Sequence, residues 1–476
     1  MLRIPKILLA AALLSFVVAA PVPAAQPSLS SQEKEWLSHA SRSEREGWIY
    51  LHQEGEPRER GFQHGYLLAP EIEKCLQTER YETYWSVPRD FDFFVAQGKI
   101  LYDGKIPEEQ AEELRGMALG LERAGIEVAG YDVLVAHNAY IELVGYWWPW
   151  AREKEAERVK NISLGGCSSF VATGSWTADG GVVLAHNTWF SYSEGALCNL
   201  VLDVAPEKGF RIIMQSVPGC IHSATDFFVC SSGIVGSETT IGGFSGYDPS
   251  GTPEFCRVRK AMQYAGSLDE WAKIMLEGNN GAYANSWLLG DVRTGEIARL
   301  ELGLKHHKFE KTKDGYYCGS NIAEDRDVLL DETNLNFSDI RLSAVSRRLR
   351  WHELMKENRS KITVESAKAF LADHYDSYLQ REHPGCRSLC GHHELETGET
   401  FIVHPPFRPG GAVDGKAVDT RLAREMSFWA RWGNSCGMPF TAAEYLAQHP
   451  QYEWLRGYLP DRPTREWVVF EETGKK

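Results

Sequence analysis

Hydrophobic and polar positions follow a helical period in the first third of the chain. Through residues 108–124, apolar side chains recur every three or four positions, Pro107 precedes the segment, and Gly125 follows it. This pattern predicts a helix over 108–124, and residues 30–160 as a whole are expected to be mainly helical. A charged stretch at 152–160 then leads to a glycine-bearing approach to Cys167.

Beyond Cys167 the pattern changes to that of strands. Residues 168–176 and 182–187 predict two paired strands, because turn residues at 177–181 separate them. Cys167 then lies at the outer end of a hairpin. Further strands are expected at 200–204, 210–215, 227–229, 287–291 and 297–302. Further helices are expected at 268–276, 343–358 and 364–379. Stacked antiparallel strands with helices outside them indicate a layered α+β protein.

The N-terminus has the pattern of a signal peptide. Arg3 and Lys6 precede an apolar run at 7–20, and small residues follow at Ala24 and Ala25. Residues 1–25 are therefore expected to be removed on export, which predicts a secreted or periplasmic protein. No stretch reaches the roughly 20 apolar residues that a membrane helix requires, so no integral membrane segment is predicted.

The balance of charge excludes one class of partner. The chain has 51 basic and 65 acidic residues, for a net charge of −14. Nucleic-acid binding requires a basic surface that neutralises phosphates. A small-molecule substrate is the expected partner instead.

The ten cysteines indicate disulfides if the protein is exported, although spacing does not fix their pairing. One simple pairing joins Cys436 to Cys390. Cys386 and Cys390, followed by His392 and His393, imitate a metal cluster, but their spacing fits no standard zinc pattern. We therefore predict no metal and no cofactor.

Cys167 is the strongest candidate for chemistry. It follows two glycines, which permit the strained backbone that an internal acyl shift requires. If the bond between Gly166 and Cys167 breaks, the new α-amino group lies beside the thiol and acts as its base. Cleavage would give two fragments, 26–166 and 167–476, which are expected to stay associated. On composition alone, a buried or disulfide-bonded cysteine is the commoner explanation.

Several segments resemble a known family. Residues 166–170, 177–180 and 185–189 are similar to the nucleophile hairpin of the phospholipase B-like proteins. Residues 231–240 resemble that family's second active-site strand, and residues 285–291, with Glu301 soon after, resemble a third.

A more distant likeness is to acyl-coenzyme A:6-aminopenicillanate acyltransferase, through residues 55–65 and 113–116. Trp189 and Thr239 stand near positions where that enzyme is expected to have aspartate and asparagine. The phospholipase B-like proteins are therefore the closer relatives.

The resemblance implies an N-terminal-nucleophile hydrolase with a four-layer αββα fold, in which two stacked antiparallel sheets lie between helices. Cys167 matches the nucleophile, and the precursor is cleaved after Gly166. Such a reaction needs hydrogen-bond donors for its oxyanion, and Thr239 and Asn285 are the candidates. The alternative for both is an ordinary hydrogen bond in a strand or turn.

Four further residues complete the predicted site. His186 is expected to orient the α-amino group or the substrate, although it is equally explained as a satisfied histidine in a sheet. Asn187 is predicted to be a catalytic residue that helps to shape the pocket. Trp189 and Glu238 are expected to shape the substrate pocket. The alternative for Trp189 is an ordinary core position, and the alternative for Glu238 is a solvated surface charge.

The predicted function is an exported, self-cleaving cysteine hydrolase that opens a linear amide or N-acyl bond through an acyl-enzyme. Hydrolysis of phospholipid acyl esters is the alternative, and a non-catalytic binding protein on the same fold is another. A papain-like pairing of Cys167 with His404 lacks local support. Residues 433–437 match a serine-hydrolase elbow, but the preceding residues 426–432 are predicted to be helical, which is the wrong context.

Overall fold

The computed structural model describes residues 28–126, 129–154, 166–396 and 408–470, with no side-chain description for 153 and 154. The predicted signal peptide and His404 lie outside the described residues. Within them, no helix combines the length and apolar character needed to cross a membrane.

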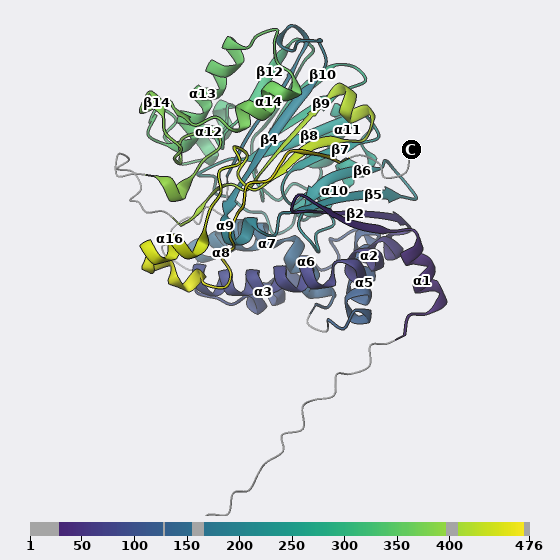
Figure 1. Cartoon of the computed structure of the whole chain (residues 1–476). Coiled ribbons are helices and arrows are strands. Elements are labelled where there is room, and N and C mark those ends of the chain that lie inside the picture. Colours follow the sequence, from purple (N-terminus) through teal and green to yellow (C-terminus); the bar gives the residue numbers. More distant parts are fainter. Residues whose placement is uncertain (1–27, 127–128, 155–165, 397–407, 471–476) are drawn as a thin grey trace, which may run out of the picture.

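The described strands form two large sheets (Figure 1). The first has the order β1 (Ser41–Arg45), β2 (Trp48–Gly55), β5 (Leu200–Pro206), β6 (Ile212–Ser216), β7 (Phe227–Cys230), β8 (Ile234–Thr240), β9 (Asn285–Asp291), β10 (Glu296–Leu302), β11 (His307–Thr312). The second has the order β12 (Gly315–Gly319), β3 (Gly166–Thr173), β4 (Val183–Ser191), β16 (Asp414–Asp419), β17 (Phe428–Trp432), β18 (Val468–Phe470), with β15 (Gly410–Ala412) also on β4. A small third sheet joins β13 (Tyr375–Asp376) to β14 (Arg381–Glu382).

The pairing is antiparallel except between β2 and β5, which run parallel. Several helices and the strands β3 and β4 of the second sheet lie between β2 and β5 in the chain, so no tight turn constrains their direction. The predicted hairpin around Cys167 is present, with β3 and β4 paired in register from Gly166 opposite Trp189 to Ala172 opposite Val183.

The two sheets stack face to face. Val171 and Leu184 from the second sheet share a buried cluster with Val235 and Leu288 from the first. The hydroxyl groups of Ser169 and Ser237 also meet across this interface, 2.7 Å apart.

Helices cover the outer faces of both sheets (Figure 1). The first sheet packs against helices that include α2 (Pro57–Leu67), α3 (Ala69–Ser86), α4 (Phe91–Leu101), α5 (Glu108–Arg123), α6 (Tyr131–Asn138), α10 (Glu254–Tyr264) and α11 (Leu268–Leu276). The second packs against α13 (Ser343–Glu357) and α14 (Val364–Leu371). The expected four-layer αββα architecture is confirmed.

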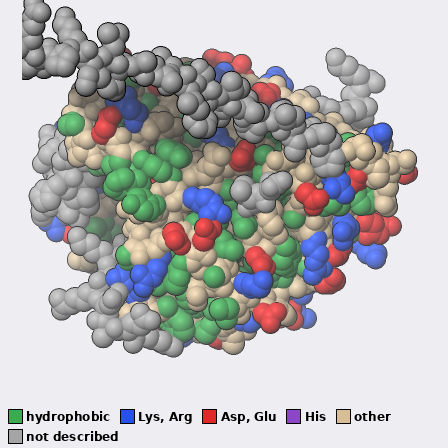
Figure 2. Space-filling view, turned by 90° about the horizontal axis from the view of Figure 1, so that it is seen from below, with side chains coloured by type: hydrophobic (Ala, Val, Ile, Leu, Met, Phe, Trp, Pro, Cys, Tyr) green, Lys and Arg blue, Asp and Glu red, His purple; other side chains and the backbone are tan. Residues whose placement is uncertain are grey.

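The remaining helices are short. They are α1 (Ser31–Ser38), α7 (Tyr140–Glu142), α8 (Trp148–Lys154), α9 (Tyr192–Gly195), α12 (Arg326–Glu332), α15 (Thr420–Arg424), α16 (Ala442–Gln448), a π-helix η1 (Leu143–Trp147), and the 3₁₀ turns η2 (Gly174–Trp176), η3 (His393–Leu395) and η4 (Pro450–Leu455). Hydrophobic side chains lie between charged ones on the surface seen from below in Figure 2.

Helix α5 agrees closely with its prediction and packs against α2 at very short range. A Cβ atom at Gly61 would lie 1.8 Å from the Glu113 carbonyl oxygen, and one at Gly116 would lie 2.1 Å from that of Arg58. Only glycine permits this approach. The two segments that carried the more distant likeness therefore form a helix pair.

Two sequence-based predictions are wrong here. The helix expected at 364–379 ends at Leu371. The Asp373 carboxylate accepts a hydrogen bond from the backbone of Tyr375, a local turn that competes with the helix. Residues 428–432 form strand β17 instead of a helix, because they pair with β16 and β18.

Candidate active site

Cys167 lies at the start of β3, buried, on the wall of a cavity of about 720 Å³. The helical layer, the first sheet and the loops after β12 all contribute to the lining. Residues in contact with the cavity include Gly166, Trp189, Asp226, Tyr283, Asn321 and Arg347. A buried thiol that opens into a large cavity can meet a substrate.

The backbone of Cys167 is held on both sides. Its N–H donates to Asn321 Oδ1 at 2.9 Å. Arg347, on α13, donates to the Cys167 carbonyl oxygen at 2.5 Å and to Asn321 Oδ1 at 2.9 Å. The Arg347 guanidinium also lies 4.2 Å from the centre of the Trp189 ring. The nitrogen of Cys167 therefore has a fixed position and a prepared acceptor.

The glycine before Cys167 does not show the strain that the sequence suggested. Gly166 belongs to β3, pairs with Trp189, and is not among the described residues with positive φ. Among non-glycine residues that line the cavity, positive φ occurs at Asp226, at 59°, and Asn321, at 69°. Non-glycine residues in this region are uncommon and cluster at functional sites.

The surroundings of Cys167 keep its thiol protonated. Burial raises the pKa of Cys167 well above its usual value, and the nearby carboxyl groups of Glu238 and Asp226 raise it further. A backbone hydrogen bond from Trp189 and the charge of Lys416 act in the opposite direction. The thiol therefore needs a base at the moment of attack.

Glu238 and Asp226 form a buried acid pair beside the cavity. Burial is the main cause that raises the pKa of both groups, and the charge of Asp226 raises that of Glu238 further. The Tyr283 hydroxyl donates to Glu238 Oε1 at 2.9 Å, and Thr240 Oγ1 donates to the Tyr283 oxygen at 3.0 Å. Two neighbouring buried carboxyls favour retention of a proton between them.

Lys416 provides a fixed positive charge behind the nucleophile. Its side chain is fully buried and donates to Thr188 Oγ1 and Asp414 Oδ1, both at 2.6 Å. Thr188 lies directly opposite Cys167 in the β3–β4 pair and lines the cavity.

His186 and Asn187 occupy opposite faces of β4. His186 is on the face of Cys167 but lies opposite Ser169, deeper in the sheet, and does not line the cavity. Burial and the charge of Lys416 lower its pKa well below the usual value, so its ring is neutral. Asn187 points the other way, and its amide donates to the carbonyl oxygens of Leu371 and Leu389.

The two predicted oxyanion donors also point in opposite directions. Asn285 lies opposite Thr240 in the β8–β9 pair, so Thr239 is on the other face. Thr239 faces the second sheet, where it meets Gly319. Both side chains are buried and their polar atoms have no hydrogen-bond partner among the described residues, yet neither lines the cavity.

Of the predicted residues, Cys167, Gly166 and Trp189 line the cavity, while Glu238 reaches it through Tyr283. Sequence reasoning missed Asn321 and Arg347. They lie in a loop and inside a helix, over 150 residues from Cys167 along the chain. No local motif marks them.

The serine-hydrolase elbow also fails in the structure, although β17 supplies the strand that the sequence did not predict. Ser435 is fully buried and donates to the Leu371 carbonyl oxygen at 2.9 Å, and the next helix, α16, begins only at Ala442. An exposed nucleophile between strand and helix is therefore absent at 433–437.

Comparisons with known proteins support the resemblance. The family model "Phospholipase B" matches residues 111–301, which include Cys167. A phospholipase B from Crotalus adamanteus is 23% identical over 310 residues, 58% of this chain and 53% of that protein. Phospholipase B-like 1 from Homo sapiens is 22% identical over 309 residues, 57% of this chain and 52% of that protein.

The chain spans about half the length of these curated relatives. Among solved structures, a conjugated bile acid hydrolase from Clostridium perfringens has a TM-score of 0.32 at 9% identity, covering 64% of this chain and 97% of that one. Penicillin V acylase from Agrobacterium tumefaciens has a TM-score of 0.27 at 10% identity, covering 56% and 83%. The resemblance to phospholipase B-like proteins is confirmed.

Proposed function

We propose that this chain is a cysteine hydrolase of the N-terminal-nucleophile type, in which Cys167 attacks a linear amide or N-acyl bond. The observation that carries this proposal is the position of Cys167 on the cavity wall. Its backbone N–H donates a hydrogen bond to Asn321 Oδ1. Hydrolysis of phospholipid acyl esters is the second candidate, favoured by the phospholipase B family match.

Self-cleavage between Gly166 and Cys167 is part of the proposal. It would convert the Cys167 amide into an α-amino group, whose ordinary pKa of about 7.7–8.0 suits a base at neutral pH. Asn321 would accept a hydrogen bond from this amine and orient it. The amine takes the thiol proton, the sulfur attacks the carbonyl carbon, and the protonated amine then supplies the proton to the leaving group. Water hydrolyses the resulting thioester.

The fragments 26–166 and 167–476 are proposed to remain together after cleavage. Strand β2 of the first fragment pairs with β5 of the second along seven residues, from Ile49 opposite Leu200 onward. The buried Glu113 carboxylate of the first fragment also lies 3.1 Å from Arg259 of the second. These contacts need no covalent link, and Cys75 of the first fragment is a buried free thiol.

The cavity lining supports a substrate with an apolar acyl chain and a negative end. Aromatic side chains of Tyr146, Trp150 and Phe244 line it together with the guanidinium group of Arg347. Burial lowers the pKa of Arg347 to about 10, so it remains charged at neutral pH. An N-acyl amino acid and a lysophospholipid both have this chemistry.

Export is proposed on the N-terminal pattern alone. N-terminal sequencing of protein secreted from an expressing cell tests it. A first residue near 26 supports removal of the leader, and a chain that still starts at Met1 rejects it.

A hydrolysis screen tests the activity. Matured protein is incubated with N-acyl amino acids, peptides and lysophospholipids, with the Cys167→Ala variant as the control. Release of fatty acid or free amine by the native protein alone supports the proposal. The absence of turnover on every compound would favour a non-catalytic binding protein.

A further inference from the structure

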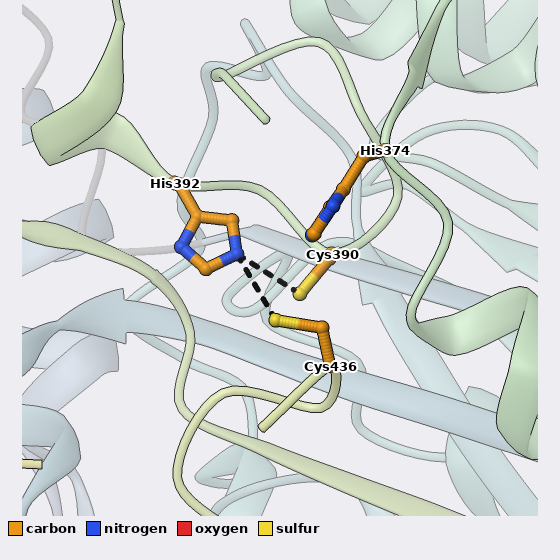
Figure 3. A group of neighbouring side chains, drawn as sticks. All are labelled: His374, Cys390, His392 and Cys436. Atoms are coloured by element: carbon orange, nitrogen blue, oxygen red, sulfur yellow. Dashed lines mark hydrogen bonds between the residues drawn. The ribbon is translucent and has the colours of Figure 1, made fainter. Parts of the chain in front are cut away.

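Four potential metal ligands, none of which lines the cavity, meet at one end of the second sheet. They are His374, Cys390, His392 and Cys436 (Figure 3). Three separate loops bring them together: one after α14, one before η3, and one after β17. The sequence pattern grouped Cys390 and His392 with Cys386 and His393, but these last two residues line the cavity instead.

The ligand atoms are as close as a tetrahedral metal requires. One ligand atom from each residue lies within 4.8 Å of all the others. His392 Nε2 is 3.4 Å from Cys390 Sγ and 3.4 Å from Cys436 Sγ (Figure 3). Zinc bonds of about 2.3 Å to sulfur and about 2.0–2.1 Å to nitrogen place tetrahedral ligands roughly 3.6 Å apart.

The surrounding groups orient these ligands. His392 Nδ1 lies 3.1 Å from Glu394 Oε1, an arrangement typical of zinc-bound histidines, and Tyr192 donates to the same carboxylate oxygen. The Met438 N–H donates to Cys436 Sγ at 3.3 Å. His374 Nε2 is buried and has no hydrogen-bond partner among the described residues.

We infer that His374, Cys390, His392 and Cys436 bind one Zn²⁺ ion in a closed Cys₂His₂ site. Two thiolates balance the charge of the ion, so the buried complex is neutral. Four protein ligands complete the tetrahedron and leave no position for water or substrate. The ion is therefore structural.

The site supports the wall of the substrate cavity. The indole nitrogen of Trp189 donates to the Leu389 carbonyl oxygen at 3.3 Å, next to Cys390. Gly391, between the two ligands Cys390 and His392, is so close that a Cβ there would lie 2.3 Å from the Trp189 ring. Zinc thus fixes the segment that holds Trp189, one of the cavity residues.

A disulfide between Cys390 and Cys436, the pairing that the sequence suggested, is the competing outcome. All ten cysteines are free thiols in this structure. A disulfide would consume both sulfur ligands, so the two states exclude each other.

The metal content of the purified full chain tests the inference. Elemental analysis is expected to find one zinc per chain, and Cys390→Ser or Cys436→Ser should each reduce it at least tenfold. Cys318→Ser, which alters a half-buried thiol on β12 outside the cluster, should leave it unchanged.

Cobalt substitution covers the case in which the serine variants do not fold. The native chain, stripped of zinc under reducing conditions and loaded with Co²⁺, is expected to show the intense visible absorption of tetrahedral thiolate ligation. The absence of that absorption would overturn the inference. So would a Cys390–Cys436 disulfide in peptide mass spectra of the isolated protein, or zinc that persists in both serine variants.

Discussion

Cys167, which is buried, and Cys436, which is half-buried, have surroundings with opposite effects on the pKa of the thiol. At Cys167, burial and the carboxyl groups of Glu238 and Asp226 raise the pKa. At Cys436, the hydrogen bonds with Cys390 and His392 lower the pKa well below its usual value. The same side chain therefore suits two tasks, and its neighbours decide which.

The two cysteines also differ in what surrounds them. Cys167 lines a cavity of about 720 Å³, and Asn321 and Arg347 hold its backbone. The sulfur of Cys436 lies 3.4 Å from His392 Nε2 and accepts a hydrogen bond from the Met438 N–H. A cysteine beside a substrate-sized cavity fits a nucleophile, whereas one in contact with other potential ligands fits a metal site.

The largest expected effect is the loss of activity when Cys167 is replaced. Cys167→Ala should lower turnover by about a thousandfold or more and leave the chain uncut, because attack and self-cleavage both depend on this sulfur. Cys167→Ser should retain or slow the cleavage, with much reduced activity. Turnover assays and denaturing electrophoresis measure the two effects.

Cys318→Ala is the control for this experiment, because it removes a half-buried thiol on a strand that pairs with β3. It should remain active. Normal turnover in Cys167→Ala, or a fully active enzyme still continuous through Gly166 and Cys167, would contradict the mechanism.

The next largest effect is expected at the predicted oxyanion donors. Losing one donor typically lowers kcat by about a hundredfold with little change in KM. Thr239 and Asn285 are both predicted donors, but they lie on opposite faces of the first sheet. Neither side chain lines the cavity, but Thr239 faces the sheet that holds Cys167, so we expect the loss in Thr239→Val. Asn285→Ala, on the other face, should have a smaller effect. Steady-state kinetics measure kcat and KM for both variants. A hundredfold loss of kcat in both would contradict an oxyanion donor on only one face of the sheet.

Asn321 should have a somewhat smaller effect, because it positions the Cys167 nitrogen without reacting. Asn321→Ala is expected to lower kcat by about tenfold to a hundredfold. Asn321→Asp keeps an acceptor at the same place and should recover part of the loss. Asn336→Ala, in an exposed loop, serves as the control. Equal kcat in Asn321→Ala and the native enzyme would remove Asn321 from the site.

Removing zinc should affect stability more than chemistry. A strong chelator is expected to lower the Tm of the native chain. It should also raise KM, because Trp189, which lines the cavity, would lose its fixed position, and it should change kcat less. Calorimetry and kinetics on the same sample measure this. The Cys390→Ser variant should already have the lower Tm and show no further change, whereas an equal chelator response in both proteins would argue against the site.

The smallest expected effect is a shift in pH dependence. The Asp226 carboxylate raises the pKa of Cys167, so Asp226→Asn should lower that pKa and move the alkylation profile of Cys167 to lower pH. The shift should be about one unit or less, since burial is the larger cause. Iodoacetamide rates across pH, read by mass spectrometry, measure it. Asp269→Asn, at an exposed carboxylate, should leave the profile unchanged. A shift to higher pH would contradict the assigned sign.

Local patterns were enough to predict much of the fold. The α5 prediction of 108–124 is close to the observed Glu108–Arg123, because its apolar stripe and its flanking proline and glycine are short-range signals. The prediction at 426–432 was wrong because β17 is a strand only through its neighbours β16 and β18. Partners in a sheet override local preference.

The sequence by itself determined the hairpin with Cys167 at its outer end, the layered α+β class and the resemblance to phospholipase B-like proteins. Each rests on residues close together in the chain. Tertiary structure alone decided that Asn321 and Arg347 hold the Cys167 backbone, that Thr239 and Asn285 face opposite ways, and that His374 and Cys436 join Cys390 and His392. These outcomes depend on strand register and on loop packing between distant segments, which a single sequence does not specify.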